Sequence, residues 1–394
     1  MRDGWKEISL EDLETSGVIK LGRGDVISKK DMEADPGANP VYSSAENKNG
    51  MIGKYAKFMF DEELITWSVD GGGHIFYRPK HKFSVTNIGG WLRILDDKVF
   101  TYQFLTYALQ RLHKQHTFDW QHKAHPSVIR KLYTRILMPS LPEQKRIVDL
   151  ISSVDSYIQA LQQQLDNAKN YKSAYVSTVI VEMFGRGKKV KIADIAEVKG
   201  GKRLPKGTPW SEEPTEHRYI RATDIKDGII LTENLVYVPD YVWPTISRYI
   251  VNEGDIVITI AGTIGEVGVV PGNLDGVNLT ENAAKIVVDR KFVNSSYLGM
   301  LLGSSYYQQD IDSKTKKTTQ PKLGLNMINS IEIPLPDLVE QNKIFSVVTQ
   351  IDSVIASTQN LISRTVGLRS GLLADLLSGE HEIPTSYDKV MGAA

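Results

Sequence analysis

The sequence predicts an α+β protein in which two similar domains are separated by two long antiparallel coiled-coil helices, forming a pseudo-two-fold internal repeat. Three observations support this class: a long helical pattern without breakers, a second copy of it, and a similar order of elements before each copy. A chain of 394 residues is also too long for one ordinary core. The expected segments are a domain at 1–135, a helix at 136–185, a domain at 186–332, a helix at 333–380 and a tail at 381–394.

The first long helix is predicted from apolar residues that alternate spacings of four and three, which is a heptad pattern. Neither Pro nor Gly occurs between Gln144 and Met183. The helix can therefore run for about 40 residues, or roughly 60 Å. The predicted seam consists of Ile147, Ile151, Val154, Ile158, Leu161, Leu165 and Ala168.

The second long helix is predicted because the first recurs at a shift of 197 positions, where 11 of the 38 residues from 136 to 173 are identical without a gap. Two unrelated core helices would explain the periodicity but not these identities. Because each helix follows one domain along the chain, their seams can pack together only if the helices are antiparallel. The second seam consists of Ile344, Val348, Ile351, Ile355, Thr358, Ile362 and Thr365.

Each domain is predicted to contain short strands followed by one helix. At an offset of 193, Ile65 and Leu105 of the first domain fall on Ile258 and Leu298 of the second, and so do the pairs Thr66/Thr259 and Leu109/Leu302. In the first domain, strands are expected at 63–69, 74–77, 83–87 and 91–95, and a helix at 100–112. In the second, strands are expected at 190–198, 218–222, 254–260, 267–270 and 284–288, and a helix at 295–308.

The overall composition is that of a soluble globular protein, with 41% hydrophobic and 24% charged residues. No apolar run reaches a membrane span of about 18 residues, and the N-terminal stretch lacks the apolar core of a signal peptide. The chain has no cysteine, which excludes disulfides and thiolate metal sites. We therefore expect a cytoplasmic protein without membrane contact. The net charge is zero, so any nucleic-acid binding must come from local basic patches.

Catalytic motifs are mostly missing. The glycine-containing stretch 254–265 lacks the Gly-Lys-Ser/Thr of a phosphate loop, and 39–42 only partly resembles an amino-group methyltransferase motif. The acidic residues and Lys343 near Pro336 lack nuclease spacing. A histidine cluster at 113–125 leaves two interpretations open, a zinc site or a basic, aromatic-flanked loop.

Basic patches recur between the domain helix and the long helix of both halves, and they predict phosphate contacts to a two-fold ligand such as duplex DNA. The ordinary alternative for each patch is a solvated surface. The candidate DNA-binding residues are Arg78, Lys80, His81, Lys114 and Lys123 in the first half, and Lys202, Arg203, Lys314, Lys316 and Lys317 in the second.

Taken with these features, the chain resembles the specificity subunit of a type I restriction–modification system over nearly its whole length. The resemblance is strongest in the doubled junctions MPSLPEQ at 138–144 and LPDLVEQ at 335–341, each of which opens a long helix. The segments ITWSVDGGG at 65–73, KFSVTNIGG at 82–90 and GDIVITIAGTIG at 254–265 also resemble target-recognition-domain segments.

This resemblance implies a non-catalytic subunit whose two target-recognition domains each read one half of a split DNA site. It implies helices that act as a spacer and as a docking surface for two modification subunits, with Glu143, Gln144, Glu340 and Gln341 as docking residues. Restriction subunits would complete the complex. No cofactor is expected on this chain, because S-adenosylmethionine and ATP belong to the partner subunits. The alternatives are a fused methyltransferase or nuclease, and a scaffold that binds only protein.

Overall fold

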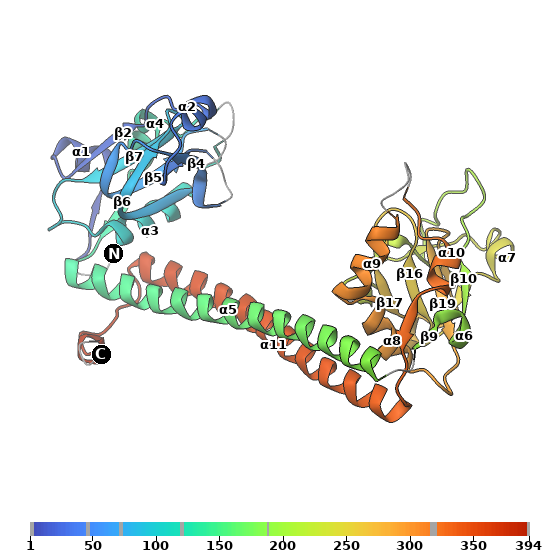
Figure 1. The fold of residues 1–394 in the computed structure, drawn as a ribbon. Helices are drawn as coiled ribbons and strands as arrows, with labels where there is room; N and C mark the ends of the chain where they lie inside the picture. The colour runs from blue at the N-terminus through green and yellow to red at the C-terminus, as the bar shows by residue number, and fades with distance from the viewer. Residues whose placement is uncertain are drawn as a thin grey trace. The chain divides into compact units, whose positions relative to one another are not determined.

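The computed structural model describes residues 4–44, 48–70, 74–118, 122–186, 189–315 and 321–391 (Figure 1). It contains two compact units, one made of residues 1–161 and 361–394 and the other of residues 162–360. Each unit therefore holds one globular domain and part of each long helix. Within the described ranges, no helix is both long and apolar enough to cross a membrane.

The first domain is built on a six-stranded sheet in the order β2-β7-β5-β6-β3-β4. All neighbouring strands are antiparallel except β3 and β6. Its strands are β2 (Ile19–Arg23), β3 (Asn39–Tyr42), β4 (Met51–Tyr55), β5 (Phe60–Ser68), β6 (Ile75–Val85) and β7 (Gly89–Ile94). Its helices are α1 (Leu10–Thr15), α2 (Lys29–Ala34), α3 (Tyr102–His113) and α4 (Pro126–Leu132), and β1 (Lys6–Ile8) pairs with β8 (Ile136–Met138).

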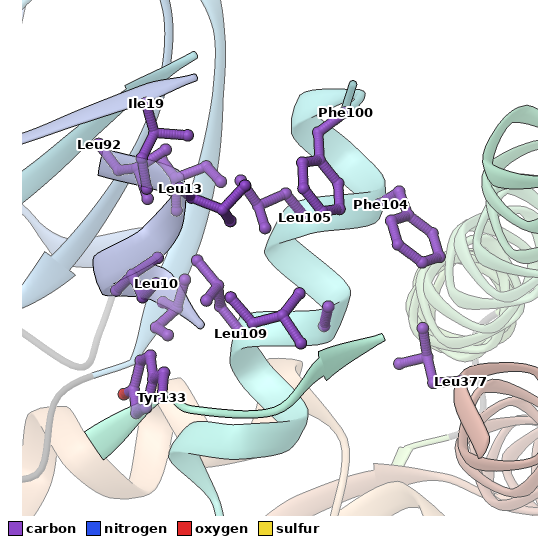
Figure 2. Packing of buried hydrophobic residues seen from close by; sticks show 14 of the residues in the cluster. Leu10, Leu13, Ile19, Leu92, Phe100, Phe104, Leu105, Leu109, Tyr133 and Leu377 are labelled. Carbon is purple, nitrogen blue, oxygen red and sulfur yellow. The ribbon is translucent and has the colours of Figure 1, made fainter. Parts of the chain in front are cut away.

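The core of this unit lies between the sheet, α1 and α3 (Figure 2). Leu105 and Leu109 of α3 point toward Leu13 and Leu10 of α1, while Phe104 points toward the long helices (Figure 2). Leu377 of the second long helix belongs to the same buried cluster. The apolar side chains of α3 follow a helical period, so one helix can join the domain to the helix pair.

The second domain contains two four-stranded sheets, β10-β19-β16-β17 and β14-β11-β18-β15. The strands of the first sheet are β10 (Ala196–Gly200), β16 (Ile256–Thr259), β17 (Val267–Val269) and β19 (Ala283–Val288). The second contains β11 (Arg218–Ile220), β14 (Val236–Tyr237), β15 (Ile250–Val251) and β18 (Val277–Leu279). Shorter elements are β9 (Lys189–Lys191), α6 (Ile192–Ile195), β12 (Ile225–Lys226), β13 (Ile229–Ile230), α7 (Trp243–Ile246), α8 (Ser295–Leu302), α9 (Ser305–Thr315), α10 (Leu325–Asn329) and β20 (Glu332–Pro334).

The two domains repeat the same internal hydrogen bonds. The Thr86 amide donates to the Tyr42 carbonyl at 2.9 Å, and the Thr280 amide donates to the Ile220 carbonyl at 3.0 Å. In both domains a parallel strand pair precedes this bond, β3 with β6 and β11 with β18. The helix equivalence at offset 193 holds, because Thr101 and Asn294 are the N-caps of α3 and α8.

Several strand predictions were wrong in detail. The segments expected at 74–77 and 83–87 form one strand, β6, and the strand expected at 190–198 is interrupted by the short helix α6. The helix expected at 295–308 breaks after Leu302, where Gly303 caps α8. The strand registers pair Trp67 with Gly90 and Ile258 with Ala284, so Trp67, and not Ile65, is the counterpart of Ile258.

The long helices are α5 (Leu141–Gly185) and α11 (Leu338–Ser378), which run side by side (Figure 1). In the first unit, the Arg369 guanidinium donates to the Asp155 carboxylate, with Nη2 and Oδ2 2.8 Å apart. In the second unit, Lys172 Nζ lies 2.6 Å from Asp352 Oδ1. Within each unit the pairing is antiparallel, because Ile147 packs in one cluster with Leu377, and Val176 in another with Val348.

Candidate DNA-contacting surfaces and the docking face

Arg78 is not a surface residue, contrary to the prediction from sequence. Its guanidinium is buried, where it donates to Thr66 Oγ1 at 2.8 Å and to the Asn49 carbonyl at 2.7 Å. It also stacks on the Tyr42 ring, 3.6 Å from the centroid. Burial lowers the pKa of Arg78 to about 10, so the group still carries its charge at neutral pH. Arg78 therefore holds the sheet together and is no longer a candidate for DNA contact.

The neighbouring basic residues of β6 do reach the surface. Lys80 is exposed, and His81 is half-buried. The His81 ring stacks on Phe83 at 4.6 Å, and its Nε2 lies 3.1 Å from the Tyr42 hydroxyl. Of these two residues, Lys80 is the better placed for a phosphate, because it is exposed and pairs with no acid among the residues that the structure describes, whereas His81 contacts Phe83 and Tyr42 inside the domain.

Lys114 and Lys123 flank the histidine-containing segment. Lys114, the C-cap of α3, is exposed, whereas Lys123 Nζ lies 3.1 Å from Asp70 Oδ1. The His113 ring stacks on Phe118 at 4.7 Å, and its Nδ1 lies 2.5 Å from the Tyr133 hydroxyl. Among the described residues no group of three or more potential metal ligands gathers. The stacking of His113 on Phe118 agrees with the aromatic-flanked loop, and the zinc alternative stays untested.

In the second domain, Lys202 and Arg203 are exposed directly after β10. The Lys202 ammonium lies 5.8 Å from the centroid of the Tyr249 ring, and Arg203 pairs with Glu281 at 2.5 Å. Lys314, at the end of α9, pairs with Asp310 at 2.5 Å. Lys316 and Lys317 lie outside the described residues, so their contribution stays a prediction.

The junction residues Gln144 and Gln341 are fully buried, so they cannot form the docking surface that was expected of them. Gln144 Oε1 accepts from the Thr101 amide at 2.9 Å, and its Nε2 donates to the carbonyls of Val99 and Pro139 at 2.8 and 3.1 Å. These bonds tie the start of α5 to the loop that opens α3.

Gln341 makes the same three bonds in the second unit. Its Oε1 accepts from the Asn294 amide at 2.8 Å, and its Nε2 donates to the carbonyls of Phe292 and Pro336 at 2.8 and 2.9 Å. The sequence signal for these residues was the Glu-Gln pair that occurs at both junctions. In the structure, the glutamine of each pair fastens a long helix to its domain. Buried backbone amides and carbonyls need hydrogen-bond partners, and at each junction the glutamine side chain supplies them.

The adjoining glutamates are also engaged within the chain. Glu143 is buried and accepts from the Trp5 indole at 3.2 Å. Glu340 is half-buried and pairs with Arg186 at 2.7 Å. All four predicted docking residues thus have a structural role where each long helix leaves its domain, and only Glu340 retains an accessible part.

The long helices instead expose a repeated set of apolar residues that the sequence reading missed. Tyr157 and Leu368 are 51% and 73% exposed in the first unit, and Tyr171 and Val354 are 60% and 47% exposed in the second. The shift of 197 relates Tyr157 to Val354 and Tyr171 to Leu368. Tyr157 and Val354 immediately precede the a residues Ile158 and Ile355, so they lie at g. Continuing the same heptads puts Tyr171 and Leu368 at g as well, on one side of the antiparallel pair.

Comparison with known proteins agrees with this two-part organisation. The family model for the type I restriction modification DNA specificity domain matches twice, at residues 2–170 and 187–364. Each match covers one domain and most of the long helix that follows it. Gln144 and Gln341, which make equivalent hydrogen bonds, fall within the first and the second match respectively.

Curated relatives are specificity subunits. The chain is 29% identical over 190 residues to a putative type I specificity subunit of Mycoplasma pneumoniae, covering 44% of this chain and 61% of that one. It is 26% identical over 279 residues to the EcoBI specificity subunit of Escherichia coli, covering 63% and 58%. The chain thus spans about 60% of these two relatives. With the MjaVIII specificity subunit of Methanocaldococcus jannaschii it shares 21% over 384 residues, covering 90% and 87%.

Solved structures with the same fold include the type I restriction–modification S subunit from M. genitalium, with a TM-score of 0.56 and 17% identity over 94% of this chain and 96% of that one. A chain from a study of complex assembly and conformational transition of the type I R-M system gives a TM-score of 0.60 and 15% identity, covering 96% and 98%. With both halves matched by the family model, this chain belongs to the type I restriction–modification DNA specificity family.

Proposed function

We propose that this protein is the DNA-recognition subunit of a type I restriction–modification complex, in which each domain reads one half of a bipartite DNA site. The observation that carries the proposal is the double family match, since each matched segment contains one domain and one long helix. The repeated joint at Gln144 and Gln341 supports it, because both domains are attached to their helices by the same bonds. Two domains that are attached to their helices in the same way suit a ligand with two-fold symmetry, such as duplex DNA.

We further propose that the exposed apolar residues of the helix pair bind two modification subunits. Each unit has one equivalent pair of these residues, which is Tyr157 with Leu368 in the first unit and Tyr171 with Val354 in the second. Large apolar side chains that lie together on an exposed face are typical of protein interfaces. Because the two pairs of exposed residues are equivalent, two copies of the same partner can bind.

The chemistry of methylation and cleavage would then belong to the partners. S-adenosylmethionine and ATP are expected on the modification and restriction subunits, with no cofactor on this chain. A fused methyltransferase or nuclease would instead need its own catalytic motif, and a protein-only scaffold would need no contact with DNA.

Purified chain, alone and reconstituted with its modification subunit, tests the proposal. We expect DNA binding without methyl transfer by the isolated chain, and methylation of a split motif by the reconstituted complex with labelled S-adenosylmethionine. Methyl transfer by the chain alone would favour the fused enzyme. A complex whose methylated motif is unchanged when this chain is replaced by another family member would favour the scaffold.

A further inference from the structure

A cavity of about 270 Å³ opens in the second domain where its two four-stranded sheets meet. Its lining includes Lys199 at the end of β10, Arg248 and Tyr249 before β15, and Lys285 near the start of β19. Lys202 lies beside it, with its ammonium over the Tyr249 ring. Three cations therefore line the same cavity as Tyr249, and a fourth lies over its ring.

The cations around this cavity differ in whether another group of the chain pairs with them. Lys199 pairs with Glu197 at 2.7 Å, and Lys285 Nζ donates to the Ile250 carbonyl at 2.8 Å and lies 3.6 Å from Asp255. Arg248 is exposed, and within the described part of the chain its guanidinium has neither an ion-pair nor a hydrogen-bond partner. A guanidinium in this state offers its full set of donors to an anionic oxygen.

The chain that borders the cavity is held in place. The Lys202 amide donates to the Leu279 carbonyl at 2.9 Å, and the Tyr219 hydroxyl donates to the Lys202 carbonyl at 2.7 Å. A Cβ on Gly201 would lie 2.0 Å from the Thr280 carbonyl oxygen, so only glycine allows this close approach. Burial raises the pKa of Tyr219 to about 12, so its hydroxyl remains a donor at neutral pH.

The first domain repeats this arrangement at equivalent positions. A Cβ on Gly24 would lie 1.9 Å from the Val85 carbonyl oxygen, and the Asp25 amide donates to that oxygen at 3.1 Å, as Lys202 does to Leu279. The register of β5 with β6 pairs Phe60 with Phe83. The register of β15 with β18 pairs Val251 with Val277.

These registers place an exposed Phe58 where the second domain has Tyr249, since each aromatic residue lies two positions before its paired strand residue. An exposed cation precedes each of them, Lys57 in one domain and Arg248 in the other. A further cation also lies over each ring, since the Lys82 ammonium is 4.8 Å from the centroid of Phe58. A solvated charge run would not reproduce this combination in two domains whose sequences differ.

We infer that these two basic–aromatic stations, Arg248–Tyr249 with Lys202 and Lys57–Phe58 with Lys82, each bind a phosphodiester of the DNA backbone. The cation would pair with the phosphate oxygens and the aromatic ring would contact the adjoining sugar. The inference rests on the proposed DNA-binding function and names residues for it. The stations differ in depth, because Trp91 in the first domain occupies the register position that Lys285 has in the second. The second station can therefore admit the phosphate more deeply.

Full-length protein and a random-sequence 40-base-pair duplex test the inference by fluorescence anisotropy across a KCl series. Each phosphate contact contributes about one unit to the slope of log affinity against log salt. We expect Arg248→Ala and Lys57→Ala each to lower the slope by about one, and the double variant by about two. Arg248→Lys should retain the slope because it keeps the charge. Lys291→Ala, an exposed cation beyond the far end of β19, should leave it unchanged.

The outcomes separate this inference from the proposed function. If the wild-type chain does not bind duplex DNA, the proposed function fails. If it binds with a clear salt dependence but Arg248→Ala and Lys57→Ala keep the wild-type slope, only the phosphodiester stations are wrong. Repeating the titration on several duplexes should give the same loss for each, whereas a loss confined to one sequence would identify a base reader and overturn the inference. Equal inhibition of wild type and Arg248→Ala by inorganic phosphate would also overturn it.

Discussion

Because a buried glutamine lies at each junction, the same substitution can be made in either unit. Gln144→Ala removes the partner of the Thr101 amide and of the Val99 and Pro139 carbonyls. A buried group left without its partner costs about 1–3 kcal/mol. The variant leaves one amide and two carbonyls without this partner, and the lower limit of about 1 kcal/mol for each gives an expected destabilisation of about 3 kcal/mol. For a unit of about 200 residues this corresponds to a decrease in Tm of about 6–12 °C.

Hydrogen exchange followed by mass spectrometry locates the damage. Gln144→Ala should raise exchange in peptides that cover the start of α3, around Thr101. Gln341→Ala should raise exchange around Asn294 at the start of α8. Gln159→Ala and Gln359→Ala, both exposed on the same helices, are the matched controls. Calorimetry on all four variants gives the Tm.

Gln144→Glu adds a test of the hydrogen-bond geometry. A carboxylate keeps the accepting oxygen but sets its second oxygen against two carbonyls, so the folded-state pKa should rise above the usual value of about 4.3. The variant should then lose stability relative to wild type as pH rises from about 4.3 to the raised folded-state pKa. If Gln144→Ala melts within 1 °C of Gln159→Ala, or if exchange rises equally in both units, the joint does not hold the domain as described.

The repeat also separates recognition, docking and spacing between different parts of the chain. Exchanging 1–135 for the first domain of another family member should change one half of the methylated motif, and a change in both halves would contradict independent reading. Tyr157→Glu together with Leu368→Glu should weaken binding of one modification subunit at least tenfold in calorimetric titration while DNA binding by the free chain persists. Seven residues added after both Leu161 and Thr358 add about 10 Å of helix and should lengthen the unread spacer by about three base pairs. Long-read mapping of methylated adenines measures this spacer, and an active variant with the original spacing would refute the idea that helix length sets the distance between the half-sites.

The helices were predictable because their signal is local and repetitive. A heptad pattern needs only the spacing of apolar residues, and Ile147, Ile151, Ile344 and Val348 lie at buried or half-buried seam positions as expected. The exposed residues at g carry no such signal. Tyr157 and Leu368 look like ordinary surface positions until the pairing of the two helices puts them on the same side.

The candidate site was less predictable because it depends on contacts between distant segments. Arg78 stands in a basic run with Lys80 and Lys82, yet the β5–β6 pairing turns it inward beneath Tyr42. Residues two apart would share one face of a regular strand. The register shifts, however, from Glu62–His81 to Leu64–Arg78, so β6 has one extra residue here that puts Arg78 on the opposite face to Lys80 and Lys82. The equivalence of Lys57 with Arg248 was likewise hidden, because loops of different length separate the matching strands in the two domains.

The ion pairs between the long helices explain how the register is chosen. The shift that relates Asp155 to Asp352 also relates Lys172 to Arg369, so the pairs Asp155–Arg369 and Lys172–Asp352 are equivalent. Partly exposed pairs of this kind contribute at most about 1 kcal/mol each, too little to account for the packing.

Their role is to exclude the alternative registers that a heptad seam permits. A slip of one heptad would keep apolar residues against apolar residues, but it would set Asp155 beside Ile362 or Leu376. The carboxylate would then lose its cation and, beside Leu376, would face a buried apolar cluster. Because Asp352 imposes the same condition in the other unit, the two helices must keep equal lengths between their ion pairs. Insertions can therefore be tolerated only when both helices receive the same number of residues.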